Sequence, residues 1–376
     1  MSAEAAQMQA SIGEVIAGRS LVVVAGSGGV GKTTVSAALG IAASGQCDGD
    51  VLVLTVDPAR RLASALGIGI DGNEAVPVPL RGESSNLYAA MLDPGLAWDA
   101  MVRAEAPPDM AERIFANPVY RKIADTFVHG NDYAALGWLD DAITSDRYQL
   151  IVVDTPPSQN ALDFFDAPVR VAEFFGSPLL GWLTGGDGTL ISSAAAKTFA
   201  SLADRLLGAE FFADVIEFFQ LMNSVVPGMV ERTSAVANKF SGSDAAFLAV
   251  ASPASDLEER LSGLAESLAE RDLSFDALVV NGVEPDVMAE PKVRDVAERV
   301  LGREKSPLSK SNTELAAPGA EYVLERHRVA RQQREIVDRL NVNAVATIPR
   351  LVHSPTTTDS LAELGLQLWG DSADMA

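Results

Sequence analysis

Eight residues near the start of the chain have the composition of a phosphate-binding loop. The pattern G-x-x-x-x-G-K-[ST] is matched by Gly26-Ser27-Gly28-Gly29-Val30-Gly31-Lys32-Thr33. Glycines let backbone N–H groups close around phosphate oxygens, because no Cβ atoms stand in the way. Lys32 can place a positive charge on the β- and γ-phosphates, and the Thr33 hydroxyl can bind Mg²⁺. We therefore expect a nucleotide site that includes Gly28, Gly29, Val30, Gly31, Lys32, Thr33 and Thr34.

The segments on either side of this loop have the order that a phosphate-binding loop requires. Five apolar residues, Leu21–Ala25, predict a buried strand that enters the loop. The segment from Thr33 to Ala43 predicts a helix whose positive N-terminus faces the phosphates. Because strand, loop and helix follow each other directly, a chance glycine-rich turn explains the pattern poorly.

Two aspartates stand where apolar segments end, and both are candidates for the same site. Leu150–Asp154 predicts a strand that ends in an acid, and Asp154 can hold Mg²⁺ through water. Asp57 follows the apolar run of the second strand, and its carboxylate can orient or deprotonate an attacking water. Asp57 also precedes Pro58, which is a standard start of a helix. The residues alone leave open whether Asp57 is a catalytic acid or an N-cap.

Apolar runs alternate with helical patterns along most of the chain. This alternation predicts an α/β fold, a mostly parallel sheet with helices on both faces. The predicted strands are apolar enough to be covered on both faces, and they are Leu21–Ala25, Val51–Val56, Leu87–Leu92, Leu150–Asp154, Phe247–Ser252, Leu278–Asn281 and Ala344–Ile348. We expect residues 1–160 and 240–376 to form this nucleotide-binding domain.

Residues 161–239 break the alternation and predict an inserted, all-helical subdomain. The segment holds nine of the fourteen phenylalanines, and a glycine-rich stretch, Gly181–Gly188, divides it. Adjacent residues such as Phe218 and Phe219 point in different directions around a helix. One interpretation is an apolar groove for a hydrophobic protein segment. The other is that both faces are buried, one in the core and one in a dimer interface.

Composition limits which partners this protein can have and in which compartment it can lie. The chain has 29 Lys and Arg against 51 Asp and Glu, a net charge of −22. Such a surface repels nucleic acid, so we expect no nucleic-acid partner. One cysteine, Cys47, excludes an intrachain disulfide framework. No signal peptide and no run of about 18 apolar residues is evident, which predicts a cytoplasmic protein that is not an integral membrane protein.

The three loops together resemble those of a known family. Val24–Thr34, Thr55–Ala59 and Asp154–Pro157 are similar to the arsenite-pump ATPases, which include the ATPases that deliver tail-anchored membrane proteins. The stretch Asp154–Phe164 resembles the actinobacterial branch termed anion-transporting ATPases. The resemblance implies a deviant phosphate-loop NTPase fold, ATP and Mg²⁺ as ligands, and hydrolysis of ATP. It also implies dimers that close face to face around two ATP molecules.

The resemblance implies roles for single residues as well. Asp57 matches the water-activating acid of the family, and Asp154 matches its second switch. Asn281 matches an adenine-reading asparagine, while Pro349 and Arg350 match the loop that packs over the base. From the residues alone, Asn281-Gly282 is equally a turn signature, and Arg350 is equally a solvated surface arginine.

Three departures from the family pattern limit what the resemblance implies. Ser27 stands where the family has a lysine that reaches across the dimer to the phosphates of the partner. Arsenite-responsive members need several cysteines, and this chain has only Cys47. The Cys-x-x-Cys zinc site of the tail-anchored targeting members is absent from the sequence.

We therefore expect a Mg²⁺-dependent ATPase that couples ATP binding and hydrolysis to dimer closure and to movement of the helical subdomain. Two alternatives remain open. One is a weakly hydrolytic regulatory subunit that pairs with a lysine-bearing paralogue, so that the dimer is a heterodimer and not a homodimer. The other is a cargo chaperone for hydrophobic protein segments.

Overall fold

The computed structural model describes most of the chain, with gaps. The described residues are 10–56, 61–70, 72–80, 85–120, 122, 130–156, 163–177, 209–293, 296, 300, 310–340, 342–351 and 353–370. The predicted catalytic Asp57 and the glycine-rich stretch 181–188 lie outside these ranges.

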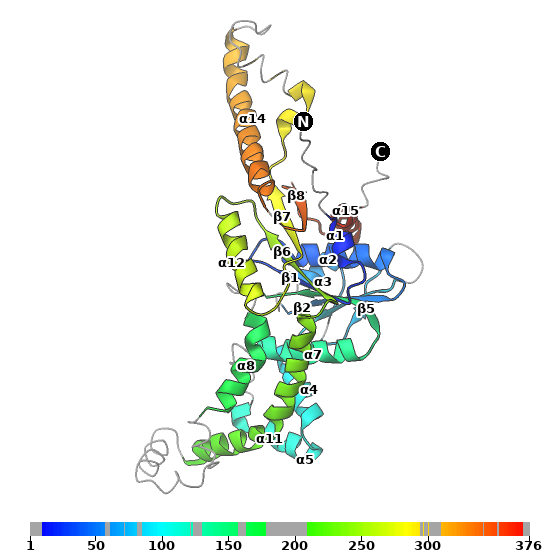
Figure 1. Cartoon of the computed structure of the whole chain (residues 1–376), viewed down its shortest axis with the longest axis vertical. Coiled ribbons are helices and arrows are strands. Elements are labelled where there is room, and N and C mark those ends of the chain that lie inside the picture. Colours follow the sequence, from blue (N-terminus) through cyan, green and yellow to red (C-terminus); the bar gives the residue numbers. More distant parts are fainter. Residues whose placement is uncertain are drawn as a thin grey trace, which may run out of the picture.

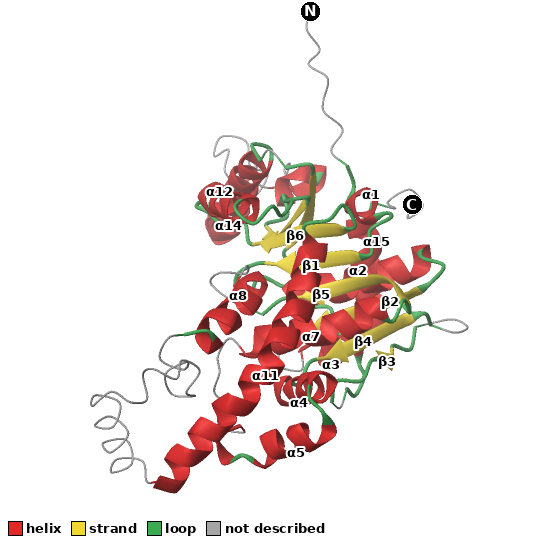
Figure 2. Cartoon of the chain, turned by 60° about the horizontal axis from the view of Figure 1, so that its bottom comes forward, coloured by secondary structure: helices red, strands yellow, loops and turns green. Residues whose placement is uncertain are grey.

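Eight strands of the described residues form one sheet in the order β3-β4-β2-β5-β1-β6-β7-β8. Figure 2 shows the part of this order from β3 to β6. The strands are β1 Leu21–Ala25, β2 Asp50–Thr55, β3 Val76–Pro77, β4 Leu87–Met91, β5 Tyr148–Asp154, β6 Ala245–Ala251, β7 Ala277–Val283 and β8 Ala344–Pro349. All neighbours run parallel except β3, which pairs antiparallel with β4 at the edge. The predicted α/β fold and all seven predicted strands are confirmed. The short β3 carries too little pattern to be predicted.

The sheet is buried on both faces, which explains the continuous apolar runs of its strands. In β6, Ala246, Leu248 and Val250 face one core. On the opposite face of the sheet, Phe247 packs into a second core and Ala249 into a third. The first core lies under α1 Ile12–Ile16, α2 Lys32–Gln46, α3 Arg61–Leu66 and α15 Thr358–Trp369.

The helices of the second face form two groups. The larger group consists of α4 Pro94–Glu105, α5 Pro108–Ala116, α7 Gly130–Thr144, α8 Asp163–Phe175 and α11 Ala209–Phe240. The smaller group, α12 Leu257–Ala269 and the end of α14 Lys310–Val337, packs over β6 and β7. Figure 1 shows α14 projecting at one end of the molecule, while α5 and part of α11 lie at the other. A short 3-10 helix, Val287–Ala289, follows β7.

The helical group around α11 contains helices that precede β5 in the sequence and helices that follow it. Besides α8 and α11, which come from the predicted insert, α4, α5 and α7 pack into the same layer. The predicted boundaries at 161 and 239 stay a prediction. Phe218 and Phe219 are 1% and 7% exposed, so both members of that pair are core residues. Phe165, Phe240 and Phe247 pack edge to face where this layer meets the sheet.

No helix in the described ranges combines the length and the apolar character that crossing a bilayer requires.

Candidate nucleotide-binding site

The strand register brings the candidate residues to one edge of the sheet. β1 lies between β5 and β6, and its Val24 is level with Asp154. β2 pairs with the other side of β5, where Thr55 is level with the same aspartate. Because the carboxyl ends of parallel strands meet at one edge, the loop after β1 opens beside Asp154.

The backbone of the loop has a shape that excludes side chains at two glycines. Gly31 has a φ of 100°, and a Cβ atom there would lie 2.4 Å from the Asn281 amide nitrogen. A Cβ atom on Gly26 would lie 2.2 Å from the carbonyl oxygen of Val250 on β6. Gly31 is also the N-cap of α2, and it has no side chain to occupy the first N–H groups of the helix. This arrangement suits an anion at the helix N-terminus.

Lys32 lies over the loop from which it comes. Its side chain is 6% exposed, and Nζ donates to the carbonyl oxygens of Gly26 at 2.9 Å and Ser27 at 3.2 Å. The ammonium group is thus already held against the turn that would surround a phosphate.

The oxygens expected to hold Mg²⁺ lie together. Thr33 Oγ1 donates to Asp154 Oδ2 at 2.7 Å, and Thr55 Oγ1 donates to the same oxygen at 2.9 Å. Asp154 is completely buried. Hydroxyl and carboxylate oxygens are the ligands that Mg²⁺ prefers, so this donor set fits the ion. Thr55 was not predicted from the sequence, although it ends the second strand.

A pocket of about 190 Å³ lies at this edge. Its lining consists of Gly29, Gly31, Lys32, Thr33, Thr34, Arg61, Ala65 and Thr155. Arg61 and Ala65 belong to α3, so this helix closes one side of the pocket. Among the predicted residues, Gly29, Gly31, Lys32, Thr33 and Thr34 therefore share one cavity, whereas Gly28 and Val30 are not part of its lining.

The predicted adenine contacts lie along the same edge. Asn281 ends the apolar part of β7 and donates from Nδ2 to the Val30 carbonyl at 2.7 Å. Pro349 ends β8, beside Val283. The Arg350 side chain is 74% exposed, and Nη1 lies 3.9 Å from Glu284 Oε2. Asn281 thus contacts the phosphate loop, whereas Arg350 lies farther along the edge. Their roles toward a base stay predictions.

Asp57 lies just beyond the described part of β2. The two preceding residues are placed at the site, because Val56 N donates to the Asp154 carbonyl at 3.2 Å and Thr55 bonds the Asp154 side chain. The chain therefore leaves β2 at the nucleotide edge, and the catalytic role of Asp57 stays a prediction.

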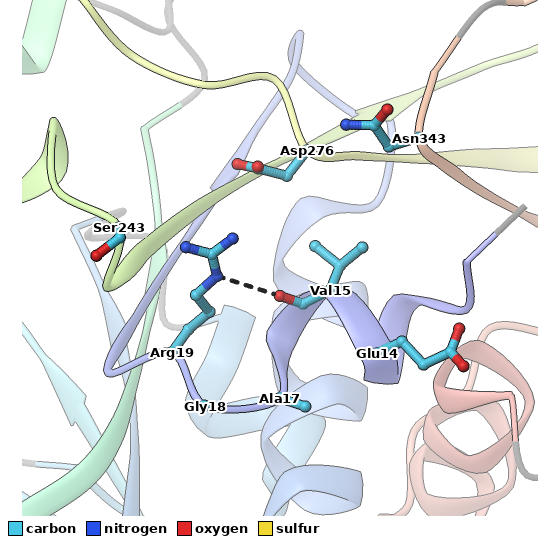
Figure 3. Close-up of a pocket in the computed structure, with 8 residues that line it drawn as sticks. All are labelled: Glu14, Val15, Ala17, Gly18, Arg19, Ser243, Asp276 and Asn343. Atoms are coloured by element: carbon cyan, nitrogen blue, oxygen red, sulfur yellow. Dashed lines mark hydrogen bonds between the residues drawn. The ribbon is translucent and has the colours of Figure 1, made fainter.

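A second pocket, of about 340 Å³, lies at the opposite edge of the sheet (Figure 3). Its polar groups already serve local structure. Arg19 Nε donates to the Val15 carbonyl at 3.4 Å, Glu14 caps α1, and Asp276 accepts from the Phe247 N–H at 2.8 Å. Because this pocket lies before β6, β7 and β8 begin, it is separate from the phosphate loop.

Comparison with known proteins gives a family model and several curated relatives that match part of this chain. The model of the family described as "Anion-transporting ATPase" matches residues 19–303. "ATPase get3" of Schizosaccharomyces pombe is 29% identical over 171 residues, 46% of this chain and 49% of the relative. "ATPase GET3" of Malassezia globosa is 32% identical over 151 residues, 38% of this chain and 40% of the relative. The chain thus spans about half the length, or less, of these curated relatives.

Proposed function

The chain belongs to the anion-transporting ATPase family, as the sequence resemblance predicts, and from this premise we propose that it hydrolyses ATP to ADP and phosphate at the loop after β1. The observation that carries the proposal is that Lys32 and Thr33 line one pocket and that Thr33 bonds the buried Asp154 beside it. These are the side chains that phosphoryl transfer needs, a cation for the phosphates and oxygens for Mg²⁺.

The proposed mechanism assigns one task to each element of the site. The loop N–H groups and the N-terminus of α2 bind the phosphate oxygens, and Lys32 exchanges two loop carbonyls for the β/γ-phosphates. Thr33 and Asp154 would hold Mg²⁺, which would supply positive charge against the negative charge of the transferred phosphoryl group. Asp57 orients the water for in-line attack on the γ-phosphate. Asn281, Pro349 and Arg350 contact the adenine.

We further propose that the site is coupled to the helical layer through two helices. Arg271, just beyond α12, forms a bidentate pair with Asp166 of α8, with Nε–Oδ1 at 3.1 Å and Nη2–Oδ2 at 2.7 Å. Such paired bonds fix the relative orientation of two elements. α8 follows the strand that ends in Asp154, so a shift of that strand end on hydrolysis would move α8 and α12 together.

The magnesium site can be tested with Asp154→Asn. The substitution keeps the volume and removes the charge, so we expect the Mg²⁺ concentration for half-maximal ATPase activity to rise about tenfold to a hundredfold. The measurement is a Mg²⁺ titration of turnover at saturating ATP. Asp99→Asn is the matched control, because Asp99 is also a buried carboxylate but bonds Tyr120 within the helical layer. An unchanged titration of Asp154→Asn would contradict the assignment.

A second candidate function is supported by Ser27. A serine brings no charge across a dimer interface, so this chain can be a weakly hydrolytic subunit whose partner is a paralogue with a lysine at that position. In that case the purified chain should turn over slowly, and mixing it with such a paralogue should accelerate hydrolysis and yield a heterodimer by native mass spectrometry. Full activity of the chain alone, as a homodimer in ATP, favours the first function.

The third candidate function is that of a chaperone, whose partner would be a hydrophobic protein segment. α8 supports this proposal, because Val169 and Phe174 on that helix are 59% and 37% exposed. The buried Phe218 and Phe219 favour a structural role for the centre of the layer.

A further inference from the structure

Two cationic side chains converge on Ser27, at the second position of the phosphate loop. Lys32 Nζ donates to its carbonyl oxygen at 3.2 Å, and Arg260 Nη2 donates to its hydroxyl at 3.0 Å. Arg260 is separated from Ser27 by 233 positions in the sequence. A single loop residue with a positive charge on each of its oxygens marks a place that favours an anion.

The fold delivers Arg260 to the loop by a short path. β6 lies beside β1, and the chain turns after Ala251 into α12, which begins at Leu257. Leu257 and Leu261 pack on alternate residues of β6 and hold the first turn of the helix against the sheet. Arg260 lies on that first turn, so its position relative to the loop is fixed by the core.

The guanidinium remains able to bind a further group. The Arg260 side chain is 40% exposed, and its other described contact is an ion pair with Asp256, with Nη1–Oδ1 at 3.8 Å. That pair is between exposed groups four residues apart on a helix, and such pairs contribute little. Arginine carries five donors in a planar fork that matches two phosphate oxygens. A phosphate can therefore replace the weak contacts with Asp256 and Ser27 by charge-assisted bonds.

We propose that Arg260 binds the polyphosphate of the nucleotide held by the loop of its own chain, and that Ser27 orients the guanidinium before the nucleotide arrives. The inference deepens the proposed ATPase function and rests on it. It gives the polyphosphate a further protein cation besides Lys32 and the pocket-lining Arg61, from a helix that the phosphate-loop motif does not include. It also explains how a loop with serine at this position keeps a positive charge nearby.

The test is calorimetric titration of the full chain in Mg²⁺ with the non-hydrolysable analogue AMP-PNP and, separately, with AMP. We expect Arg260→Ala to lower the affinity for AMP-PNP about tenfold or more, since a charge-assisted bond is lost. Arg260→Lys should recover part of this affinity, and Arg260→Gln should not. The affinity for AMP should fall by less than about twofold in all three variants, because AMP lacks the β- and γ-phosphates.

Controls separate this inference from the proposed function. Arg328→Ala removes an arginine that is 68% exposed on α14 and pairs only weakly with Glu325, so it should change neither titration. If Lys32→Ala loses AMP-PNP but Arg260→Ala matches the wild type, the inference about Arg260 is wrong and the ATPase assignment stands. Equal losses for AMP and AMP-PNP in Arg260→Ala would mean that the arginine only shapes the loop. A wild-type chain that binds neither nucleotide overturns both proposals.

A mixing experiment checks that Arg260 acts within its own chain. Arg260→Ala keeps Lys32, and Lys32→Ala keeps Arg260, so each variant alone should have reduced turnover. If a 1:1 mixture remains as slow as the average of the two variants, Arg260 serves its own loop. Recovery of turnover in the mixture would show that Arg260 reaches the phosphates of a second copy, and it would overturn the same-chain assignment.

Discussion

Replacing Lys32 by alanine should lower ATP turnover by about a hundredfold or more while the fold remains intact. Its ammonium group is held 2.9 Å and 3.2 Å from two loop carbonyls, which places it within the turn that would surround the phosphates. A preorganised donor aimed at developing charge is worth about 3 kcal/mol in the transition state, which corresponds to this loss in rate. Steady-state turnover at saturating ATP and Mg²⁺ measures the effect.

The control for this prediction is Lys239→Ala. Lys239 lies exposed in the last turn of α11, far along the chain from the loop, and its removal should leave turnover unchanged. Circular dichroism and the thermal midpoint of both variants should stay close to those of the wild type. A Lys32→Ala protein that hydrolyses ATP at the normal rate would exclude the loop after β1 as the catalytic site.

Asp57→Asn should separate ATP binding from ATP hydrolysis. The end of β2 is held against Asp154 by Thr55 and Val56, and this is the reason to expect Asp57, the residue that follows them, near the site. An amide cannot take a proton from water, and loss of a general base typically costs about 10² to 10⁴ in rate. The affinity for ATP should change by less than about twofold, since the phosphate contacts of the loop remain.

The competing role for Asp57, as a helix N-cap, makes the opposite prediction. Asparagine caps a helix nearly as well as aspartate, so a pure cap would keep its activity in this variant. Asp93→Asn supplies the matched control, because Asp93 is the N-cap of α4 and accepts from the Leu96 N–H at 3.1 Å. If the two variants behave alike in stability and in turnover, Asp57 is a cap and another group activates the water.

The sequence predicted the sheet well because nearly all of its strands are buried on both faces. Runs such as Leu21–Ala25 and Leu278–Val280 have no polar interruption and are bounded by loops, so their existence follows from composition alone. The order of the strands did not follow, since adjacency in a sheet depends on contacts between distant segments. The edge strand β3 consists of Val76 and Pro77, which is too short to give a period.

The residues of the candidate site also fall into two classes: those that a local motif predicts and those that only the fold brings together. Lys32 and Thr33 belong to one local motif, and the strand that precedes Asp154 indicates where that acid must lie. Arg61 and Arg260 carry no local signal, because their places are set by the packing of α3 and α12. Thr55 lies in the segment Thr55–Ala59 that carries the family resemblance, but its bond to Asp154 depends on strand register. Likewise, α4, α5 and α7 join the helical layer through contacts with α11, which no window of the sequence contains.

The contact between Asn281 and the phosphate loop also constrains how the sequence can diverge. The amide of Asn281 occupies the space that a Cβ atom on residue 31 would need, so the two positions are not independent. Alanine at 31 would need the Asn281 amide to move away from its bond to Val30 or residue 281 to shrink, and it would still bear the strain of a φ of 100°. The two positions therefore form an epistatic pair in one direction: a side chain at 31 is opposed as long as Asn281 keeps its place, so a change at 281 would have to come first.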